Sequence, residues 1–448
     1  MHTCMCIKLL RAGVWLLALA VWPISGVWAA DDLMTLEEAV SIGLRNNFDI
    51  QIARNTAEAA SNDTGKGTAG FLPTLDSEGS LGYDTTFYHG STTPPGGNQD
   101  YRTYGSLLSL QWTLFDGFRM FADNRRYREL ALQGEEEARD IIETTVVSIM
   151  RAYLDLVRQE QLLDVAATNR DISKDRLERE EIRRSLGGAS STDLLNARVN
   201  FNTDQTLLLD QELRVNIARK ELNILLVREP DEGLNVRKEI DVPLLELSLD
   251  ELQQRGRDAS ATLQAAHHRM LATQEQVKIA DASFWPQVLL GGQYGYTDRS
   301  LRESGKSAAL PFGDTRTRDA AATLQLRFNL FNGNIDRINA QNARLSARSA
   351  ALSRADIQQR LAGSMYELYK TFVQQVEVVG LETQNVVTAE QNMQLQKERY
   401  MTGAADSLDF RDAQVNVLRA QSALITARYQ ARIALINIQQ LIGVIAIN

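Results

Sequence analysis

Cysteine, proline and histidine are all scarce in this chain of 448 residues. Its two cysteines, Cys4 and Cys6, stand at the extreme N-terminus, so the remainder has neither a disulfide framework nor a cysteine-based metal site. With only eight prolines, the chain keeps long uninterrupted stretches rich in alanine, leucine, glutamine, arginine and glutamate, which predict very long helices. His267 and His268 are adjacent and point about 100° apart on a helix, so they do not form an i, i+4 metal pair.

An excess of positive charge is missing as well. Lys8 and Arg11 precede a short apolar run, and small residues follow it where a signal peptidase cuts, so we expect a cleaved signal peptide rather than a retained membrane helix. Removing Lys8 and Arg11 takes the formal charge from -9 to -11, and no basic patch with interleaved aromatics appears, which argues against nucleic-acid binding. The signal peptide predicts an exported protein. Because neither cysteine follows the apolar run, we expect that this protein is not lipidated at its N-terminus.

Motifs of catalysis are also absent from the sequence. It contains no Gly-x-Ser-x-Gly and no His-Glu-x-x-His. Gly305-Lys306-Ser307 imitates the end of a phosphate-binding loop, but Ser300 stands where the first glycine of that loop belongs. Carboxylates are numerous, yet no pair is set apart by an apolar setting. The sequence therefore predicts a protein that is not an enzyme and that has no cofactor and no metal site.

What the chain does have is an internal duplication. GGASSTDLLNARVN begins at Gly187 and GAADSLDFRDAQVN begins at Gly403, and seven of the fourteen positions are identical. Phe71-Leu-Pro answers Phe284-Trp-Pro, and Leu-Phe-Asp-Gly, ending at Gly117, answers Leu-Phe-Asn-Gly, ending at Gly333. Markers of this kind run the length of both halves, so the unit is far longer than the repeat of a solenoid.

The duplication predicts the domain organisation. We divide the chain into a signal peptide (1–29), a first repeat (30–230), an inter-repeat linker (231–246) and a second repeat (247–448). Each repeat contains a helix, a β-hairpin (about 74–115 and about 287–331) and a long helical hairpin with its tip near 187–192 or 403–407.

The hydrophobic period changes within each repeat. Residues 36 to about 65 have a helical period, and the runs before Gly117 and Gly333 alternate between apolar and polar residues as strands do. From Gly117 the helical period returns, with an a/d seam formed by Ile142, Val146, Ile149, Tyr153, Leu156 and Leu163. A helix of this length would reach roughly 100 Å at about 1.5 Å per residue. Its end, from Asn169 to Ser185, is charged nearly all round and is expected to stand in water or beside a partner.

The four predicted strands leave two architectures open. In a soluble sandwich their apolar faces would form a core, whereas in an outer-membrane barrel these faces would contact lipid. Four strands cannot close a barrel, because about eight are the minimum and open edges are not viable in hydrocarbon. Three chains would supply twelve strands. Export and helices of envelope-spanning length favour the barrel, with Tyr83, Phe115, Tyr296 and Phe331 as its aromatic girdle.

Taken together, these features resemble the TolC family of trimeric outer-membrane channel proteins. The resemblance rests on the duplication, the Leu36-Glu-Glu-Ala start, the Phe-x-Pro entries to the hairpins, the Leu-Phe-Asp/Asn-Gly exits and the glycine-containing tips. It implies a twelve-stranded β-barrel in the outer membrane of a Gram-negative bacterium, continued by an α-helical barrel across the periplasm. The implied partners are two further copies of the chain, outer-membrane lipid, a periplasmic adaptor and an inner-membrane pump of the ABC, RND or MFS type. The implied function is an exit duct for efflux or type I secretion.

The resemblance also implies residues at the periplasmic entrance. Gate and selectivity positions match Thr192, Asp193, Tyr400, Asp409 and Asp412. Ala405 stands where the family has a latch arginine, so that contact is absent or replaced. Three copies of Asp409 and Asp412 on one axis would form an acidic ring that favours cations.

Simpler interpretations of these residues remain. Asp193 and Asp409 lie near predicted helix starts, where a carboxylate is favoured without any gating role. The charged ends of the hairpins, with Arg183 and Arg184 beside Gly187 and with Gly403 at the other tip, serve either as an adaptor-docking surface or only as a solvated face. For the whole chain, the alternative is a soluble periplasmic coiled-coil scaffold or adaptor.

Overall fold

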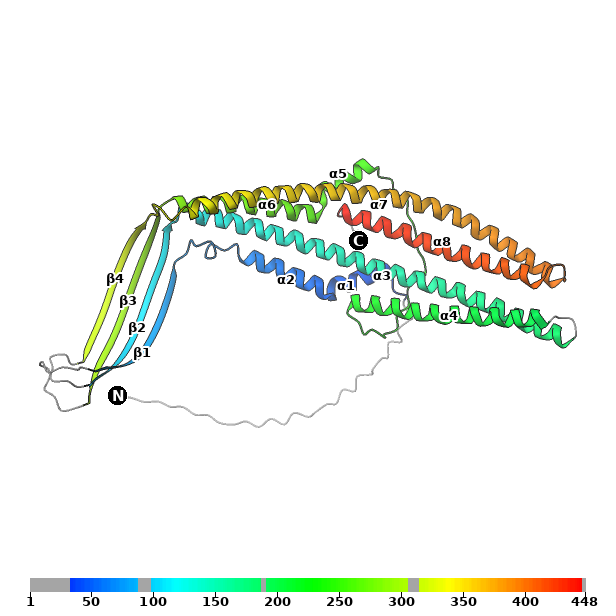
Figure 1. The fold of residues 1–448 in the computed structure, drawn as a ribbon, viewed down its shortest axis with the longest axis horizontal. Coiled ribbons are helices and arrows are strands. Elements are labelled where there is room, and N and C mark those ends of the chain that lie inside the picture. The colour runs from blue at the N-terminus through cyan, green and yellow to red at the C-terminus, as the bar shows by residue number, and fades with distance from the viewer. Residues whose placement is uncertain (1–32, 88–97, 187–190, 305–313, 445–448) are drawn as a thin grey trace, which may run out of the picture.

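The computed structural model describes residues 33–87, 98–186, 191–304 and 314–444, and the predicted signal peptide and Gly187 lie outside them. These residues form an elongated molecule with a sheet at one end and helices over the rest of its length (Figure 1). In chain order the elements are α1 (Leu36–Asn46), α2 (Phe48–Asn62), β1 (Thr74–Phe87), β2 (Asn98–Phe115), α3 (Arg119–Ser185), α4 (Ser191–Leu226), α5 (Leu249–Ala259), α6 (Ala261–Asp281), the 3-10 helix η1 (Ala282–Phe284), β3 (Gln287–Ser304), β4 (Thr315–Arg327), α7 (Ile335–Met401) and α8 (Ser407–Leu441).

The sheet contains the four predicted strands in the order β1-β2-β3-β4, all antiparallel. Because side chains alternate along a strand, the register assigns each residue to one of two faces. Leu75, Leu81, Leu108, Leu110, Trp112, Leu290, Leu324 and Leu326 share one face, and Asp76, Glu78, Gln111, Thr113, Gln293, Thr323 and Gln325 share the other. Within the described residues, β1 and β4 each pair along one edge only. The sheet is therefore apolar on one side, polar on the other and open at both edges.

The predicted Leu-Phe-Asp/Asn-Gly exits are turns from strand to helix. Gly117 and the following Phe118 both have positive φ, and Gly333 and Asn334 repeat this pair in the second half. A side chain at position 117 would lie 2.6 Å from the backbone oxygen of Ala282, so this turn requires glycine on two counts. The helix that follows each turn begins at the next residue, which explains why the motif recurs in both repeats.

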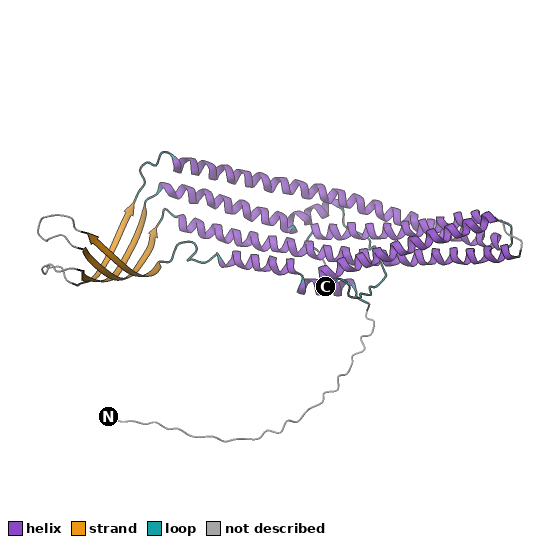
Figure 2. Ribbon diagram, turned by 60° about the horizontal axis from the view of Figure 1, so that its bottom comes forward, coloured by secondary structure: helices purple, strands orange, loops and turns teal. Residues whose placement is uncertain are grey.

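Beyond the sheet, the helices form a wall one layer thick (Figure 2). The long helices α3 and α7 contain 67 residues each and span roughly 100 Å at about 1.5 Å per residue. Two shorter helices, α2 and α4, follow one flank of α3, whereas α6 and α8 lie between α3 and α7. The wall therefore has two free edges, formed by α7 on one side and by α2 with α4 on the other. No helix in the described ranges is long and apolar enough to span a membrane.

The core lies halfway along this wall, where the linker crosses the helices. The predicted a/d seam of α3 packs there against α1, α4 and the linker, with Ile149 and Leu156 fully buried. A second cluster joins α5 to α7 and α8 around Leu252 and Met365. Thr35 and Ser248 begin α1 and α5 with the same capping box, so the duplication extends to local hydrogen bonding.

One expectation from the sequence is wrong in detail. The helix predicted from residue 36 to about 65 is broken at Asn47, whose side chain accepts hydrogen bonds from the N–H groups of Asp49 and Ile50 and starts α2. The charged end of α3 was expected to stand in water or beside a partner, and it stands beside a partner, because Arg176 and Glu180 are buried. The partner that covers them is the second helical hairpin of the same chain.

Candidate functional site at the ends of the helical hairpins

The ends of the two helical hairpins lie together at the end of the molecule opposite the sheet (Figure 1). At the second tip Gly403 has φ +75°, a left-handed conformation that favours glycine. Asp406 then caps α8, since its Oδ1 accepts hydrogen bonds from the N–H groups of Leu408 and Asp409, each 2.9 Å long. Asp406 is thus the N-cap residue, and Asp409 lies in the first turn of α8, near the helix start where a carboxylate is favoured.

Tyr400 and Glu180 form the contact nearest the tips. Tyr400 is only 7% exposed, donates a hydrogen bond to the buried carboxylate of Glu180 and stacks on Phe410 with ring centroids 5.5 Å apart. Arg183 approaches the same carboxylate oxygen from the solvent side at 3.2 Å. Burial and the hydrogen bond to Glu180 raise the pKa of Tyr400 to about 12. The other oxygen of Glu180 has no hydrogen-bond partner among the described residues.

A second contact lies deeper, between α8, α4 and α3. The guanidinium of Arg411 grips Asp204 with two bonds, of 2.5 Å from Nη1 to Oδ2 and 2.9 Å from Nη2 to Oδ1. Ser173 donates its hydroxyl to the same carboxylate and accepts a 3.2 Å bond from Arg411. The side chain of Asp204 is fully buried, and that of Arg411 is 14% exposed. Bidentate arginine–carboxylate pairs of this kind are both strong and specific in geometry.

Further polar groups complete the contact between the hairpins. Gln414 of α8 donates to the backbone oxygen of Asn169 at 2.9 Å, to its side-chain oxygen at 2.8 Å and to Ser173 at 3.0 Å. Arg176 reaches the backbone oxygen of Ser407 at 3.5 Å. Burial, and to a smaller extent the charge of Arg411, lower the pKa of the Arg176 guanidinium.

Glu180, Asp204 and Arg411 were not identified from the sequence. Glu180 and Asp204 are 0% and 1% exposed, and each carboxylate is buried among polar partners rather than in an apolar setting. A signal was present for the α3 members of the cluster: Asn169, Ser173, Arg176 and Glu180 follow steps of 4, 3 and 4, the spacing of a buried coiled-coil seam. Because these four side chains are polar, a search for apolar a/d positions does not find this seam.

The other predicted gate residues lie on the surface of this end. Asp409 and Asp412 are exposed, three residues apart on α8, and in the described part of the chain neither carboxylate forms an ion pair. Asp193 is partly buried in the first turn of α4, and Thr192 beside it is exposed. Arg184, predicted for docking, is also exposed.

The predicted girdle residues lie at the opposite end of the molecule. Tyr83 and Tyr296 share the apolar face of the sheet with Leu110, and Phe115 joins this face by pairing with Val288. Phe331 follows β4 and is 78% exposed. These aromatic side chains therefore border the apolar face at both of its ends.

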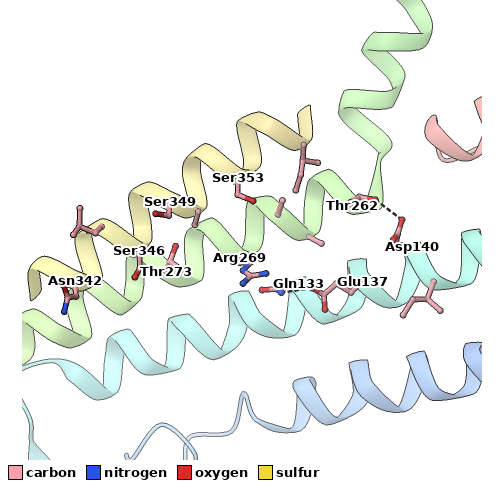
Figure 3. Close-up of a pocket in the computed structure, with 16 residues that line it drawn as sticks. Gln133, Glu137, Asp140, Thr262, Arg269, Thr273, Asn342, Ser346, Ser349 and Ser353 are labelled. Atoms are coloured by element: carbon pink, nitrogen blue, oxygen red, sulfur yellow. Dashed lines mark hydrogen bonds between the residues drawn. The ribbon is translucent and has the colours of Figure 1, made fainter. Parts of the chain in front are cut away.

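A groove of about 950 Å³ runs between α3, α6 and α7 (Figure 3). Its lining mixes apolar residues such as Leu345 with Gln133 and Glu137 on α3, Arg269 on α6 and Ser349 on α7. Thr262 donates a 2.9 Å hydrogen bond to Asp140 at one end of it. No group of three or more metal-ligating side chains occurs in the described ranges. The contacts at the hairpin ends therefore hold helices of the two repeats together.

Comparison with known proteins agrees with this fold. A family model described as "Outer membrane efflux protein" matches residues 39–226 and 252–444. Nodulation protein T of Rhizobium leguminosarum bv. viciae is 20% identical over 424 residues, which cover 91% of this chain and 81% of that protein. TolC of Escherichia coli K12 is 20% identical over 434 residues, 96% of this chain and 85% of that protein. The outer-membrane channel OprN superimposes with a TM-score of 0.73 at 20% identity, covering 91% of this chain and 89% of that structure.

The family model matches most of each half of the chain, and the family consists of transport channels rather than enzymes. Its members lie in the outer membrane and extend into the periplasm, which fits a sheet at one end of an elongated helical wall. The soluble scaffold considered from the sequence does not fit this family. The chain belongs to the outer membrane efflux protein family and is an outer-membrane protein of the TolC type.

Proposed function

We propose that three copies of this chain form an outer-membrane exit duct that passively conducts substrates delivered by a periplasmic adaptor and an inner-membrane pump. In this assembly three sheets close into a twelve-stranded barrel, and three helical walls close into a periplasmic tube. The two free edges of the chain carry this proposal.

The sheet supports closure because its edges are open and its faces differ. Four antiparallel strands cannot close on themselves, and an unpaired edge is not tolerated in hydrocarbon. Pairing β4 of one copy with β1 of the next removes both edges. The apolar face with Tyr83, Phe115 and Tyr296 would then meet lipid, and the face with Gln111 would line a wet lumen.

The free edge at α7 supports a second copy at the level of the helices. Its exposed apolar residues Ile338, Leu345, Leu352, Tyr366, Val373 and Val387 all fall on one seven-residue register. Strict seven-residue spacing is the pattern of a helix that supercoils around a neighbour. Within the described chain that neighbour is missing, because these six side chains are all exposed and the buried residues of α7, such as Met365 and Phe372, fall on other positions of the heptad.

The free edge at α4 gives the proposal its strongest support, because the duplication allows α4 to be compared with the equivalent part of α8. In the second repeat, Tyr429 and Ile433 of α8 pack against the core cluster built on α3. Their equivalents in the first repeat, 216 residues earlier, are Leu213 and Ile217 of α4, which are 59% and 45% exposed. A contact that α8 makes within the chain is thus left open for α4, and α7 of another copy supplies the missing helix.

The entrance of the duct would lie at the hairpin ends. Three copies of the exposed Asp409 and Asp412 around one axis would favour cations, with Thr192, Asp193 and Tyr400 near the same opening. Exposed Arg183 and Arg184, beside the tips at Gly187 and Gly403, offer a surface for the adaptor. The relatives named above include an outer-membrane channel and a nodulation protein.

The free edge at α7 can be tested with one double variant. Leu345→Glu with Leu352→Glu places two charges in the α7 register, and we expect the heat-modifiable trimer of the outer-membrane fraction to be lost. Both Leu345 and Ser346 border the groove between α3, α6 and α7 (Figure 3), so Ser346→Glu is the matched control: it places a charge on the same exposed turn and at the same groove but outside the seven-residue register. A wild-type protein recovered as a salt-soluble monomer, or a double variant that trimerises like the control, would overturn the proposal.

A further inference from the structure

We propose that Arg316 and Arg318 of β4 bind a phosphate group of lipopolysaccharide, the phosphorylated glycolipid of the outer leaflet of the outer membrane. The inference rests on the proposed trimeric duct, in which the apolar face of the sheet meets lipid. It adds a specific lipid-binding site to that face, at the end where the strands leave the membrane on its outer side.

The arginine pair stands at the border of the apolar face. The register places Arg316 and Arg318 on the same face of β4 as Leu324 and Leu326, and only alanine and leucine occupy this face from residue 320 to residue 326. The rows that continue from these positions across β3, β2 and β1 contain no charged residue on this face. The step from Arg318 to Leu326 is about 27 Å along an extended strand, or roughly 20 Å of membrane depth at a tilt of about 40°. This is most of the apolar band of a barrel, so the arginines lie where the headgroups begin.

This border belongs to the outer leaflet. β4 begins at Thr315, at the end of the sheet away from the helices, and ends at Arg327, from where the chain continues to α7 (Figure 1). Because members of the family extend into the periplasm, the end of the sheet away from the helices faces outward. An arginine on the lipid face is costly at the middle of a bilayer and is tolerated near its interface. In the outer leaflet that interface is formed by sugars that carry phosphate groups directly above the acyl chains.

Two side chains of β3 hold the arginine pair in position. Asp298 accepts a 3.0 Å hydrogen bond from Nε of Arg316 and a 3.4 Å bond from the hydroxyl of Tyr296, both at Oδ2. The ring of Tyr296 lies under Arg318, whose Cζ is 6.0 Å from the ring centroid. The side chain of Arg316 is 73% exposed and is held through Nε, so within the described structure its two terminal nitrogens remain available to a ligand.

The spacing and charge of the pair suit a phosphate monoester. Residues i and i+2 on one face of a strand lie about 6.8 Å apart, which allows one phosphate to receive bonds from both guanidinium groups. A monoester, as on the sugars of this glycolipid, offers three acceptor oxygens and a charge of about −1.5 to −2. The diester of a phospholipid has a single charge and one fewer free oxygen. Asp298 neutralises only one of the two arginines, so the site stays positive in a chain whose formal charge is −9.

The neighbouring copy in the proposed trimer supplies no carboxylate to this site. Closing the barrel pairs β4 with β1 of the next copy and keeps the apolar faces on one side. The described residues of β1 on that face are uncharged in every register: Leu75, Ser77, Gly79, Leu81, Tyr83 and Thr85. The acidic residues of β1 lie on the opposite face: Asp76, Glu78 and Asp84. The anion that matches the arginine pair therefore comes from the lipid.

The test is native mass spectrometry of the purified trimer in detergent, titrated with bisphosphorylated lipid A, the membrane anchor of lipopolysaccharide. We expect one site per chain, and binding at least about tenfold tighter than that of dephosphorylated lipid A or phosphatidylglycerol. Arg316→Gln with Arg318→Gln should weaken binding of lipid A by about tenfold or more, because both forks are lost.

The matched control is Arg299→Gln with Arg327→Gln, which removes two charges from the polar face of the same strands. Arg299 lies over the ring of Tyr101 there, with its Cζ 3.8 Å from the centroid. We expect this control to bind lipid A as the wild type does. If the glutamine variant does not trimerise, Arg316→Lys with Arg318→Lys keeps both charges but loses the two-pronged geometry, and it should weaken binding by about threefold.

The outcomes separate this inference from the proposed function. Lipid A binding that is unchanged in the glutamine and lysine variants, or that falls equally in the control, would overturn the site. Equally tight binding of dephosphorylated lipid A or of phosphatidylglycerol would overturn its assignment to the phosphate of the glycolipid. A wild-type protein that forms no trimer would instead overturn the proposed duct.

Discussion

Removing one oxygen atom at the hairpin ends is the sharpest test of their packing. Tyr400→Phe deletes the hydroxyl that donates to Glu180 but keeps the ring stacked on Phe410 at 5.5 Å. Glu180 is 0% exposed, and one of its oxygens already lacks a partner among the described residues. The variant therefore leaves Arg183 as the remaining ion-pair partner of this carboxylate.

The expected cost follows from the charge of the acceptor. A hydrogen bond to a buried charged group contributes about 1.5 to 3 kcal/mol, and we expect about 2 kcal/mol because Arg183 stays. A change of about 2 kcal/mol in local opening corresponds to roughly thirtyfold faster hydrogen exchange. Exchange should accelerate by this factor at the end of α7, over 393–401, and much less near Phe372, which is buried in the middle of the molecule.

A double-variant cycle isolates the interaction energy between Tyr400 and Glu180. Glu180→Gln and the combination with Tyr400→Phe give the coupling between the two side chains, which we expect to exceed 1 kcal/mol. Tyr366→Phe is the control, since that tyrosine lies on the same helix and is 53% exposed. Exchange at 393–401 that changes less than threefold in Tyr400→Phe would refute the reasoning, because the buried carboxylate would then not depend on this donor.

Three further predictions concern pH, the strand-to-helix turns and the helix caps. Burial and Glu180 raise the pKa of Tyr400 from 10.0 to about 12. The hydrogen bond of Tyr400 therefore stabilises the docked hairpins fully below pH 10, and this stabilisation is lost as the pH rises through about 12. Protection from hydrogen exchange at 393–401 should fall across this range in the wild type and stay flat in Tyr400→Phe. Gly117→Ala should lower the melting temperature of the trimer more than Gly333→Ala, since both glycines have positive φ but only position 117 also meets atoms at 2.6 Å. Ser248→Ala removes the cap and the capping box of α5 and should cost about 1 kcal/mol in thermal or denaturant unfolding.

The sequence predicts the repeating parts of this molecule well because each depends on local chemistry. The a/d spacing around Ile149 predicts the seam of α3, and alternation around Leu110 predicts the strands of the sheet. The break at Asn47 was missed because the apolar pattern continues across it, although an asparagine side chain that accepts two backbone bonds starts a new helix.

The polar contacts between the hairpins could not be predicted in the same way. Glu180 and Tyr400 are 220 residues apart, and Asp204 and Arg411 are 207 apart. Period and composition indicate which residues share a helix face, but they do not indicate which two helices meet. A buried charge also looks like a solvated one in sequence, since both interrupt an apolar pattern. Only the packing of α8 between α3 and α7 distinguishes the two cases.

The duplication itself argues that the pair of Arg411 and Asp204 would occur at only half of the hairpin contacts around the proposed ring. In a closed trimer, helical hairpins of the two repeats alternate, so contacts within a chain alternate with contacts between chains. Arg411 of the second repeat corresponds to Leu195 in the first repeat, and Asp204 of the first repeat corresponds to Ala420 in the second. Neither Leu195 nor Ala420 carries a charge. Leu195 is 58% exposed on the free edge of α4, where another copy would cover it. Contacts between chains at this position would then be apolar, whereas the equivalent contacts within each chain are polar.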